Sequence, residues 1–279
     1  MQLTPRYGER PILVVEVSES GEHPVMRQRR RLEAVLRELD PGEWRAPSRC
    51  EGWTVQDVVT HLSSTNAFWA FSISSGLAGE PTTFLSTFDP VASPAELVAR
   101  AQGAPVSQTL DEFAAGNDSL AASLEAVDAD GWSTLAEAPP GHLPMRLVAD
   151  HALWDSWVHE RDILVPLGRT PAVEPDELRH CLRYAVGLGR AFAVSRGDTD
   201  ARSMVVEVVD PDARLVVVAE GDHVRVHAGE APVDVGHVQG DAVAIVELLS
   251  MRDAGVPAPP GLDWLTLGLA EVFDTAASA

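Results

Sequence analysis

The chain has 279 residues, of which 42 are acidic and 21 are basic, so its formal net charge is −21. A surface of this sign repels phosphate backbones and anionic lipid, which argues against nucleic acids and membranes as partners. All of the basic residues are arginine. Without a lysine the chain can form neither a Walker A phosphate loop nor a pyridoxal Schiff base.

Hydrophobic residues make up 45% of the chain, enough to bury a core. The only cysteines, Cys50 and Cys181, predict free thiols in a reducing compartment rather than a disulfide framework or a Cys-rich zinc site. The first residues contain no long apolar signal segment, and no run of about 18 apolar residues follows. We therefore expect a soluble, cytoplasmic protein. The missing lysine, with abundant Ala, Val, Gly and Pro, is typical of a GC-rich bacterial genome.

Residues 1–24 are predicted to form an N-terminal extension with one short β-branched run, "PILVVEV", before a breaker-rich stretch. Thr54 is the predicted N-cap of a following helix, and Asp57 is the acid of its capping box. The 3.6-residue spacing of apolar positions predicts five helical segments, the third of them interrupted. They cover about residues 25–39, 54–75, 93–127, 145–165 and 174–195.

Around residue 200 the apolar period changes from helical spacing to alternation. The runs "SMVVEVVD", "RLVVVAEG", "HVRVHAG" and "VDVGHVQG" predict four short strands, and two helices are predicted to close the chain. The predicted fold class is α+β. It consists of a helical bundle at residues 25–198 followed by a small C-terminal domain with a sheet at residues 199–279.

The segment 145–165 carries His151, Asp155 and His159 at intervals of four residues. On a helix these side chains lie along one stripe with about 40° of drift per step. Neighbouring members are about 6 Å apart along the axis, close enough for two of them to bind one ion. Imidazole nitrogens and carboxylate oxygens are ligands for zinc and other divalent first-row metals. The pattern is therefore compatible with a metal site.

A metal held by one helix needs a further ligand from a facing helix, and His61 is the candidate because it lies at the edge of an apolar stripe. Two other interpretations stand beside this one. A histidine on a half-apolar helix is commonly a hydrogen-bonded core residue, and Asp155 with His159 can form an ion pair. Spacing alone does not decide between these interpretations.

Two further motifs fail on geometry. His223 and His227 in "HVRVH" have metal-like spacing, but on a strand they are about 13 Å apart and cannot bind one ion. "GLGRAF", beginning at Gly187, is an incomplete dinucleotide fingerprint that follows no strand. The sequence contains no G-x-S-x-G elbow and no H-E-x-x-H helix.

Three segments resemble the mycothiol-dependent maleylpyruvate isomerase family, a part of the wider DinB-like superfamily. "CEGWTVQDVVTHL", residues 50–62, is similar to the family's first motif, which includes a histidine. "WDSWVHERDI", residues 154–163, is similar to its second motif, where an acidic residue lies four positions before a histidine and an aspartate three after it. "VQGDAVAIVELLSMRD", residues 238–253, resembles the closing helix of the family's C-terminal domain, with Arg252 at a recurrent arginine.

The resemblance extends from about residue 25 to residue 255 and implies a DinB-like four-helix bundle that binds a divalent metal, usually zinc. By position its ligands are His61, Asp155 and His159. Three protein ligands leave a coordination position open, as in catalytic sites. A metal there lowers the pKa of a bound thiol or water. In the family the thiol is typically mycothiol, the low-molecular-weight thiol of actinobacteria, and the Lys-free composition agrees with such a source.

Two positions depart from the family pattern. The carboxylate is Asp155 where the family usually has a glutamate, so its reach is one methylene shorter. Glu160 follows the motif histidine where an arginine is common. Both changes suggest a site that differs from the isomerase pattern.

Three other residues are candidates for supporting roles. His151 is interpreted as a fourth ligand or a general base, or as a core histidine. Arg252 is interpreted as binding a substrate carboxylate through its planar fork, or as a surface charge on a helix. Asp162 is interpreted as accepting a hydrogen bond from His159 or an arginine, or as one half of a plain salt bridge.

The sequence therefore favours a metal- and mycothiol-dependent enzyme that acts on a small molecule. We expect thiol S-transfer or thiol exchange because of the two departures from the isomerase pattern. The alternatives are a maleylpyruvate-type cis–trans isomerase and a non-enzymatic bundle that binds a metal or a hydrophobic ligand. The expected partners are a small-molecule thiol and a small-molecule substrate.

Overall fold

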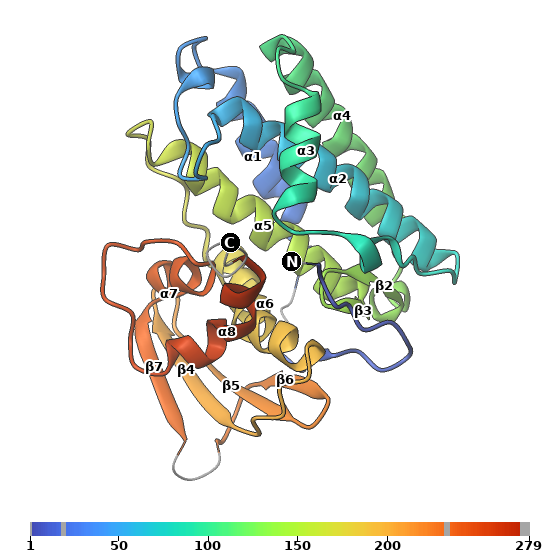
Figure 1. The fold of residues 1–279 in the computed structure, drawn as a ribbon, viewed down its shortest axis with the longest axis vertical. Helices are drawn as coiled ribbons and strands as arrows, with labels where there is room; N and C mark the ends of the chain where they lie inside the picture. The colour runs from blue at the N-terminus through green and yellow to red at the C-terminus, as the bar shows by residue number, and fades with distance from the viewer. Residues whose placement is uncertain (1, 18–20, 232–234, 274–279) are drawn as a thin grey trace.

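The computed structural model describes residues 2–17, 21–231 and 235–273, in which a bundle of helices lies against a mixed β-sheet (Figure 1). The α+β fold class predicted from the sequence is confirmed. Within the described ranges, no helix combines the length and the apolar character needed to cross a membrane.

The bundle is built from four long helices whose apolar faces meet in a core around Leu62, Phe113 and Ile163. The four helices are α1 (Val25–Arg37), α2 (Val55–Leu77), α4 (Val106–Glu125) and α5 (Met145–Leu164). Helix α2 contacts α4 and α5, and α1 contacts the same two helices. A shorter helix, α3 (Ala92–Arg100), lies against α2, and the break after it confirms the interruption expected in this region.

Helix α2 begins with the capping box that the sequence predicts. The Thr54 side chain accepts a hydrogen bond from the Asp57 backbone N–H at 3.2 Å. The Asp57 carboxylate accepts one from the Thr54 N–H at 2.9 Å. These bonds satisfy two N–H groups that the first turn of a helix leaves free, which fixes the start of the helix that carries His61.

The C-terminal sheet has the strand order β1-β6-β5-β4-β7. Its three central strands form an antiparallel meander, and the outer strands β1 and β7 run parallel to β6 and β4. The strands are β1 (Leu13–Val15), β4 (Ser203–Val209), β5 (Ala213–Glu220), β6 (His223–His227) and β7 (Gly236–Asp241). The strand expected at "VDVGHVQG" therefore begins at Gly236, and positions 233 and 234 of that run lie outside the described residues.

The N-terminal segment takes part in this sheet. The sequence assigns residues 1–24 to an extension, but Leu13 pairs with Val224 and Val15 pairs with Val226 in a parallel register. Leu13 and Val15 are buried. The segment thus forms one edge of the C-terminal sheet, while the domain boundary expected at residue 198 stays a prediction.

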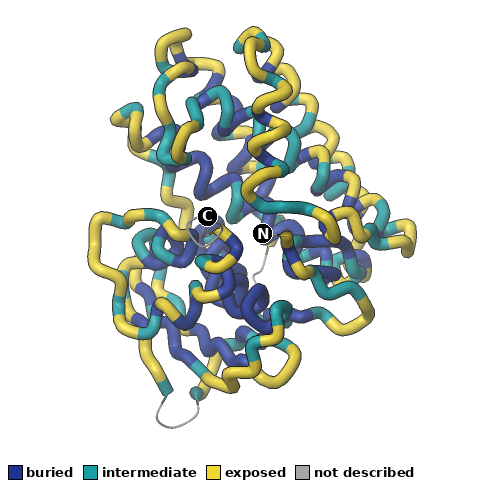
Figure 2. The backbone as a smooth tube through the Cα atoms, viewed as in Figure 1, coloured by how far each residue is buried: buried dark blue, intermediate teal, exposed yellow. Residues whose placement is uncertain are grey.

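Helix α6 (Pro175–Ser195) lies between the bundle and the sheet, and most of its residues are buried (Figure 2). It contacts α5 on one side and β5 and β6 on the other. A Cβ atom at Gly187 would lie 2.5 Å from a Leu13 methyl group, and one at Gly189 would overlap the Leu265 carbonyl. The glycines of "GLGRAF" therefore allow close packing, in agreement with the rejection of a dinucleotide motif.

The remaining elements complete the layers around α6. Helix α7 (Ala242–Leu249) contacts β4 and β7, and α8 (Leu262–Phe273) packs along α6. A two-stranded hairpin, β2 (Leu135–Ala138) with β3 (Gly141–Pro144), directly precedes α5 and contacts α2. The hairpin also contacts α5, the helix with the candidate ligands.

Candidate metal centre

Three side chains singled out from the sequence come together inside the bundle. Helix α2 supplies His61, and α5 supplies Asp155 and His159. Asp155 Oδ1 lies 3.6 Å from His159 Nε2 and 4.0 Å from His61 Nε2. The two imidazole rings meet edge to face with centroids 5.0 Å apart. One ligand atom from each residue lies within 4.8 Å of the others. We call these three residues the triad.

The triad fits a divalent cation after small side-chain movements. Ligand atoms on a tetrahedral metal are about 3.4 Å apart, so the Asp155 oxygen needs shifts of about 0.2 to 0.6 Å relative to the imidazoles. Two imidazoles and a carboxylate suit zinc, nickel or iron. The side chains of His61, Asp155 and His159 are 13, 15 and 11% exposed, so a small molecule can approach them.

The ionisation of two triad members also suits a cation. Burial opposes the charge on Asp155, but the imidazoles of His159 and His61 lower its pKa below the ordinary value. Burial and the neighbouring His159 lower the pKa of His61 to about 4. At neutral pH the carboxylate is therefore ionised, and the His61 ring has a free lone pair for a metal.

His159 is held by a second carboxylate. Its Nδ1 lies 3.0 Å from Asp162 Oδ2. Burial opposes protonation of His159, but the hydrogen bonds to Asp162 and Cys50, and the charge of Asp155, raise its pKa to about 10. A cation at the triad would displace the Nε2 proton and leave Nδ1–H donating to Asp162. Such carboxylate support orients a ligand histidine and raises its basicity.

Asp162 is in turn held by two arginines. Arg49 Nε donates to Oδ1 at 3.0 Å, and Arg252 donates to Oδ2 from Nη2 at 2.8 Å. The Cys50 thiol lies 3.3 Å from the same Oδ2. Arg252, for which the sequence suggests a substrate carboxylate, thus has its fork paired with Asp162, and its contact with substrate stays a prediction. Asp162 therefore accepts hydrogen bonds from His159 and from arginine, and the sequence suggested both as partners.

His151 lies one turn before Asp155 but faces a different group. Its Nδ1 is 2.5 Å from the Tyr184 hydroxyl, and its ring contacts Trp69 and Trp154. Burial lowers the pKa of His151 to about 4 and raises the pKa of Tyr184 well above its usual value. The tyrosine therefore keeps its proton and can donate it to Nδ1, which leaves the His151 proton on Nε2 and disfavours a role as general base. Among the described residues, His151 is in no group able to hold a metal.

Among the described residues, two other groups have metal-ligating side chains, but arginines pair with their carboxylates. Asp162, with Cys50 and His159, is bound by Arg49 and Arg252. Asp150, with His23 and His180, accepts two hydrogen bonds of 2.9 Å from Arg183. Within the described ranges no arginine is within ion-pair distance of Asp155. Asp155 is therefore the carboxylate best placed for a cation.

Glu160, the second departure from the family pattern, has a structural set of partners. It is 1% exposed and accepts hydrogen bonds from Gln28 at 3.0 Å and from Arg31 at 3.0 Å, both on α1. Arg31 also pairs with Glu177 on α6 at 2.8 Å. These bonds join α1, α5 and α6, so Glu160 serves packing of the bundle and carries no information about substrate.

Arg29 and Thr65 lie near the triad and were not singled out from the sequence. Thr65 Oγ1 donates to Asp155 Oδ2 at 3.4 Å. Arg29 is fully buried, and its charge helps to lower the pKa of both Asp155 and His151. The available signal was its position: it interrupts the buried stripe of α1 that includes Val25, Leu32 and Leu36.

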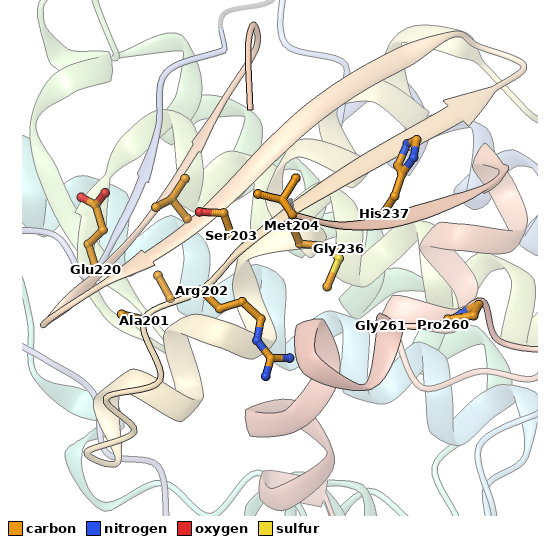
Figure 3. A pocket seen from close by; sticks show the side chains of 12 residues that line it. Ala201, Arg202, Ser203, Met204, Glu220, Gly236, His237, Pro260 and Gly261 are labelled. Atoms are coloured by element: carbon orange, nitrogen blue, oxygen red, sulfur yellow. The ribbon is translucent and has the colours of Figure 1, made fainter. Parts of the chain in front are cut away.

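A surface hollow lies away from the bundle, among β4, β5, β7 and the start of α8 (Figure 3). Its polar lining includes Arg202, Glu220 and His237. It contains no member of the triad and none of the residues that support it. The chemistry described above therefore does not involve this hollow.

Comparisons with known proteins agree with this geometry. The family model described as "Mycothiol maleylpyruvate isomerase N-terminal domain" matches residues 25–164, the span of the bundle and the triad. A crystal structure of "the mycothiol-dependent maleylpyruvate isomerase" is similar with a TM-score of 0.60 and 18% identity, covering 85% of this chain and 93% of that one. A structure of its histidine-to-alanine mutant gives a TM-score of 0.59 and 17% identity over the same shares. Because these sequence identities are low, the similarity to the two structures establishes a shared fold only. No curated protein sequence matches the chain.

Proposed function

The chain belongs to the mycothiol maleylpyruvate isomerase N-terminal domain family, and we propose that it is a mycothiol-dependent isomerase of a small unsaturated substrate. We propose further that it uses a divalent cation, zinc by preference, bound by His61, Asp155 and His159. The observation that carries this proposal is the environment of Asp155. This buried carboxylate lies between two imidazoles, and no arginine within the described ranges pairs with it.

The chemistry requires a thiolate at neutral pH, and a bound cation would supply it by lowering the pKa of the thiol. The thiolate sulfur forms a C–S bond with one alkene carbon, and the electron pair of the double bond moves to a conjugated carbonyl oxygen. Rotation about the new single bond follows. The C–S bond then breaks, the double bond re-forms in the other geometry, and the thiolate is regenerated. The cycle consumes no thiol and involves no net oxidation.

The residues of this chain set the conditions for that cycle. His61 is neutral at pH 7 because burial lowers its pKa to about 4, so it needs to lose no proton to bind a cation. Asp162 holds the Nδ1 proton of His159, which directs Nε2 toward Asp155. Arg252, from the loop after α7, fixes Asp162 and links the C-terminal domain to the site.

Thiol S-transfer is the second candidate. It uses the same C–S bond formation but ends with the adduct rather than with elimination. The shorter carboxylate of Asp155 favours it, since that change alters the site itself. Glu160 no longer supports it, because its partners are Gln28 and Arg31 in α1.

The test is an assay of the purified full chain with mycothiol and maleylpyruvate, after removal of metal and again after addition of zinc. The proposal expects zinc-dependent cis–trans conversion, followed by NMR, with the thiol concentration unchanged. Loss of one thiol per substrate would indicate transfer instead. Equal rates with and without mycothiol would reject both. We place this activity in the cytoplasm, where the free thiols of Cys50 and Cys181 stay reduced.

A further inference from the structure

Arg29, on α1, is a buried arginine whose fork has no acceptor. Its Nε donates to Asn66 Oδ1 at 2.6 Å. Nη1 and Nη2 are both buried and have no hydrogen-bond partner among the described residues. Burial lowers the pKa of Arg29 to about 10, so the side chain is still charged at neutral pH. An unpaired buried cation strongly disfavours folding, so its retention points to an anionic ligand.

The unpaired fork lies beside the triad. Asn66, its partner, follows Thr65, whose hydroxyl donates to Asp155 Oδ2 at 3.4 Å. The charge of Arg29 acts on the pKa of Asp155. Trp69, one turn further along α2, has a second buried donor, Nε1, that lacks an acceptor among the described residues. Within the described part of the chain, buried donors without acceptors thus lie near Asp155 and His151.

With a divalent cation at the triad, the charges in this region would be balanced only by a further anion. Asp155 is the nearby carboxylate, but its Oδ1 faces the imidazoles of His61 and His159. With a divalent cation at the triad, that cation and Arg29 together would exceed the single negative charge of Asp155. One ligand carboxylate beside Arg29 would offset the excess.

We propose that Arg29 binds a carboxylate of the small-molecule substrate at the inner end of the site. A planar guanidinium with two free N–H-bearing nitrogens matches a carboxylate in bidentate geometry. The triad, which is partly exposed, would then face the reacting double bond. This inference rests on the proposed function and deepens it, because it assigns a residue of this chain, Arg29, to the carboxylate of such a substrate. Arg252 is less suited to this role, since its fork already binds Asp162 at 2.8 to 3.2 Å.

The test measures binding of maleate, and of its uncharged dimethyl ester, to the zinc-loaded and the zinc-free full chain by calorimetry. Arg29→Met removes the charge at similar length, and Arg29→Lys keeps the charge but loses the fork. The matched control is Arg190→Met. Arg190 is equally buried, and its guanidinium nitrogens likewise have no hydrogen-bond partner among the described residues. Unlike Arg29, it has a carboxylate at ion-pair distance, with Asp198 at 3.0 Å, and it lies 4.5 Å over the Trp264 ring.

We expect wild type and Arg190→Met to bind maleate alike, and Arg29→Met to bind it roughly tenfold or more weakly, as the loss of a charged hydrogen bond requires. Arg29→Lys should lie between them, and the ester should bind all four proteins equally weakly. The melting temperature of Arg29→Met should equal or exceed that of wild type, because the variant no longer buries an unpaired charge. The melting temperature of Arg190→Met should fall below that of wild type.

Unchanged maleate affinity in a folded Arg29→Met variant would overturn the inference, as would the absence of maleate binding to wild type. The outcome is separable from that of the proposed function. Arg29-dependent maleate binding by a protein that binds no zinc would reject the metal site but keep the carboxylate site. Zinc binding by a protein whose maleate affinity does not depend on Arg29 would keep the metal site but reject the carboxylate site.

Discussion

His159 and Asp162 lie one turn apart on α5, with 3.0 Å between Nδ1 of the imidazole and Oδ2 of the carboxylate. This contact fixes which nitrogen of His159 can face Asp155. It also connects the triad to Arg252, whose Nη2 is 2.8 Å from the same Oδ2. The orientation of a candidate ligand on the bundle thus depends on a side chain of the C-terminal domain.

Replacement of Asp162 by asparagine should weaken zinc binding by roughly ten- to a hundredfold, because the imidazole loses its charged support. The affinity is measured by competition with a chelator. Asp176→Asn is the control, since Asp176 pairs with Arg27 on the surface and away from the triad. Equal zinc affinities for Asp162→Asn and wild type, with both proteins folded, would show that this contact does not support a metal ligand.

Glu160→Gln should lower stability without changing catalysis. Glu160 is buried and pairs with Arg31 at 3.0 Å, and loss of one partner from a buried pair costs about 3 kcal/mol. Urea unfolding gives the stability, and kcat/KM with mycothiol gives the activity. A changed kcat/KM at unchanged stability would restore Glu160 as a determinant of substrate, as its departure from the family pattern first suggested.

The metal-free protein should be less stable in mild acid than at neutral pH, in part because of His151. Burial lowers its pKa to about 4, below the unfolded value of about 6.5, so the unfolded state binds more protons between these values. Stability therefore falls as the pH falls, by about 2 kcal/mol between pH 7 and pH 5 from this residue alone. The pKa of His61 is also lowered in the folded protein, so His61 contributes to the same loss of stability. The contribution of His151 is therefore measured as the difference between wild type and His151→Phe.

The His151→Phe variant should lose less stability than wild type over this pH interval when both are unfolded in urea. Its absolute stability is also expected to fall, because the Tyr184 hydroxyl loses its partner at 2.5 Å. Only the dependence on pH tests the assignment. Identical slopes for the two proteins would mean that the pKa of His151 is the same in the folded and the unfolded state.

The parts of the site that the sequence predicted depend on local geometry. Asp155 and His159 are four residues apart on one helix, which places both side chains on one stripe whatever surrounds them. The start of α2 was predictable for the same reason, because its capping box needs only Thr54 and Asp57. The facing residue, His61, was a candidate because it lies at the edge of an apolar stripe, and the motif resemblance pointed to the same residue. Spacing on one helix alone does not identify the partner on its neighbour.

The parts that the sequence did not predict depend on contacts between distant segments. The run "PILVVEV" was recognised as β-branched, but its pairing was not predicted, because its partner β6 lies at the other end of the chain. The fork of Arg252 pairs with Asp162 from a distant part of the chain, so its partner cannot be read from either segment. Arg29 was hidden in the run "RQRRR", where only its position on the buried stripe distinguishes it.

The central claim is tested most directly by the metal content of protein purified without added metal. Wild type and the matched control His23→Ala, which alters the other His-Asp-His group, should each contain about one divalent ion per chain. His61→Ala should contain none while it keeps the circular dichroism spectrum of wild type. Metal-free wild type that takes up no zinc on titration, or a His61→Ala variant that retains the ion at full stoichiometry, would contradict the account.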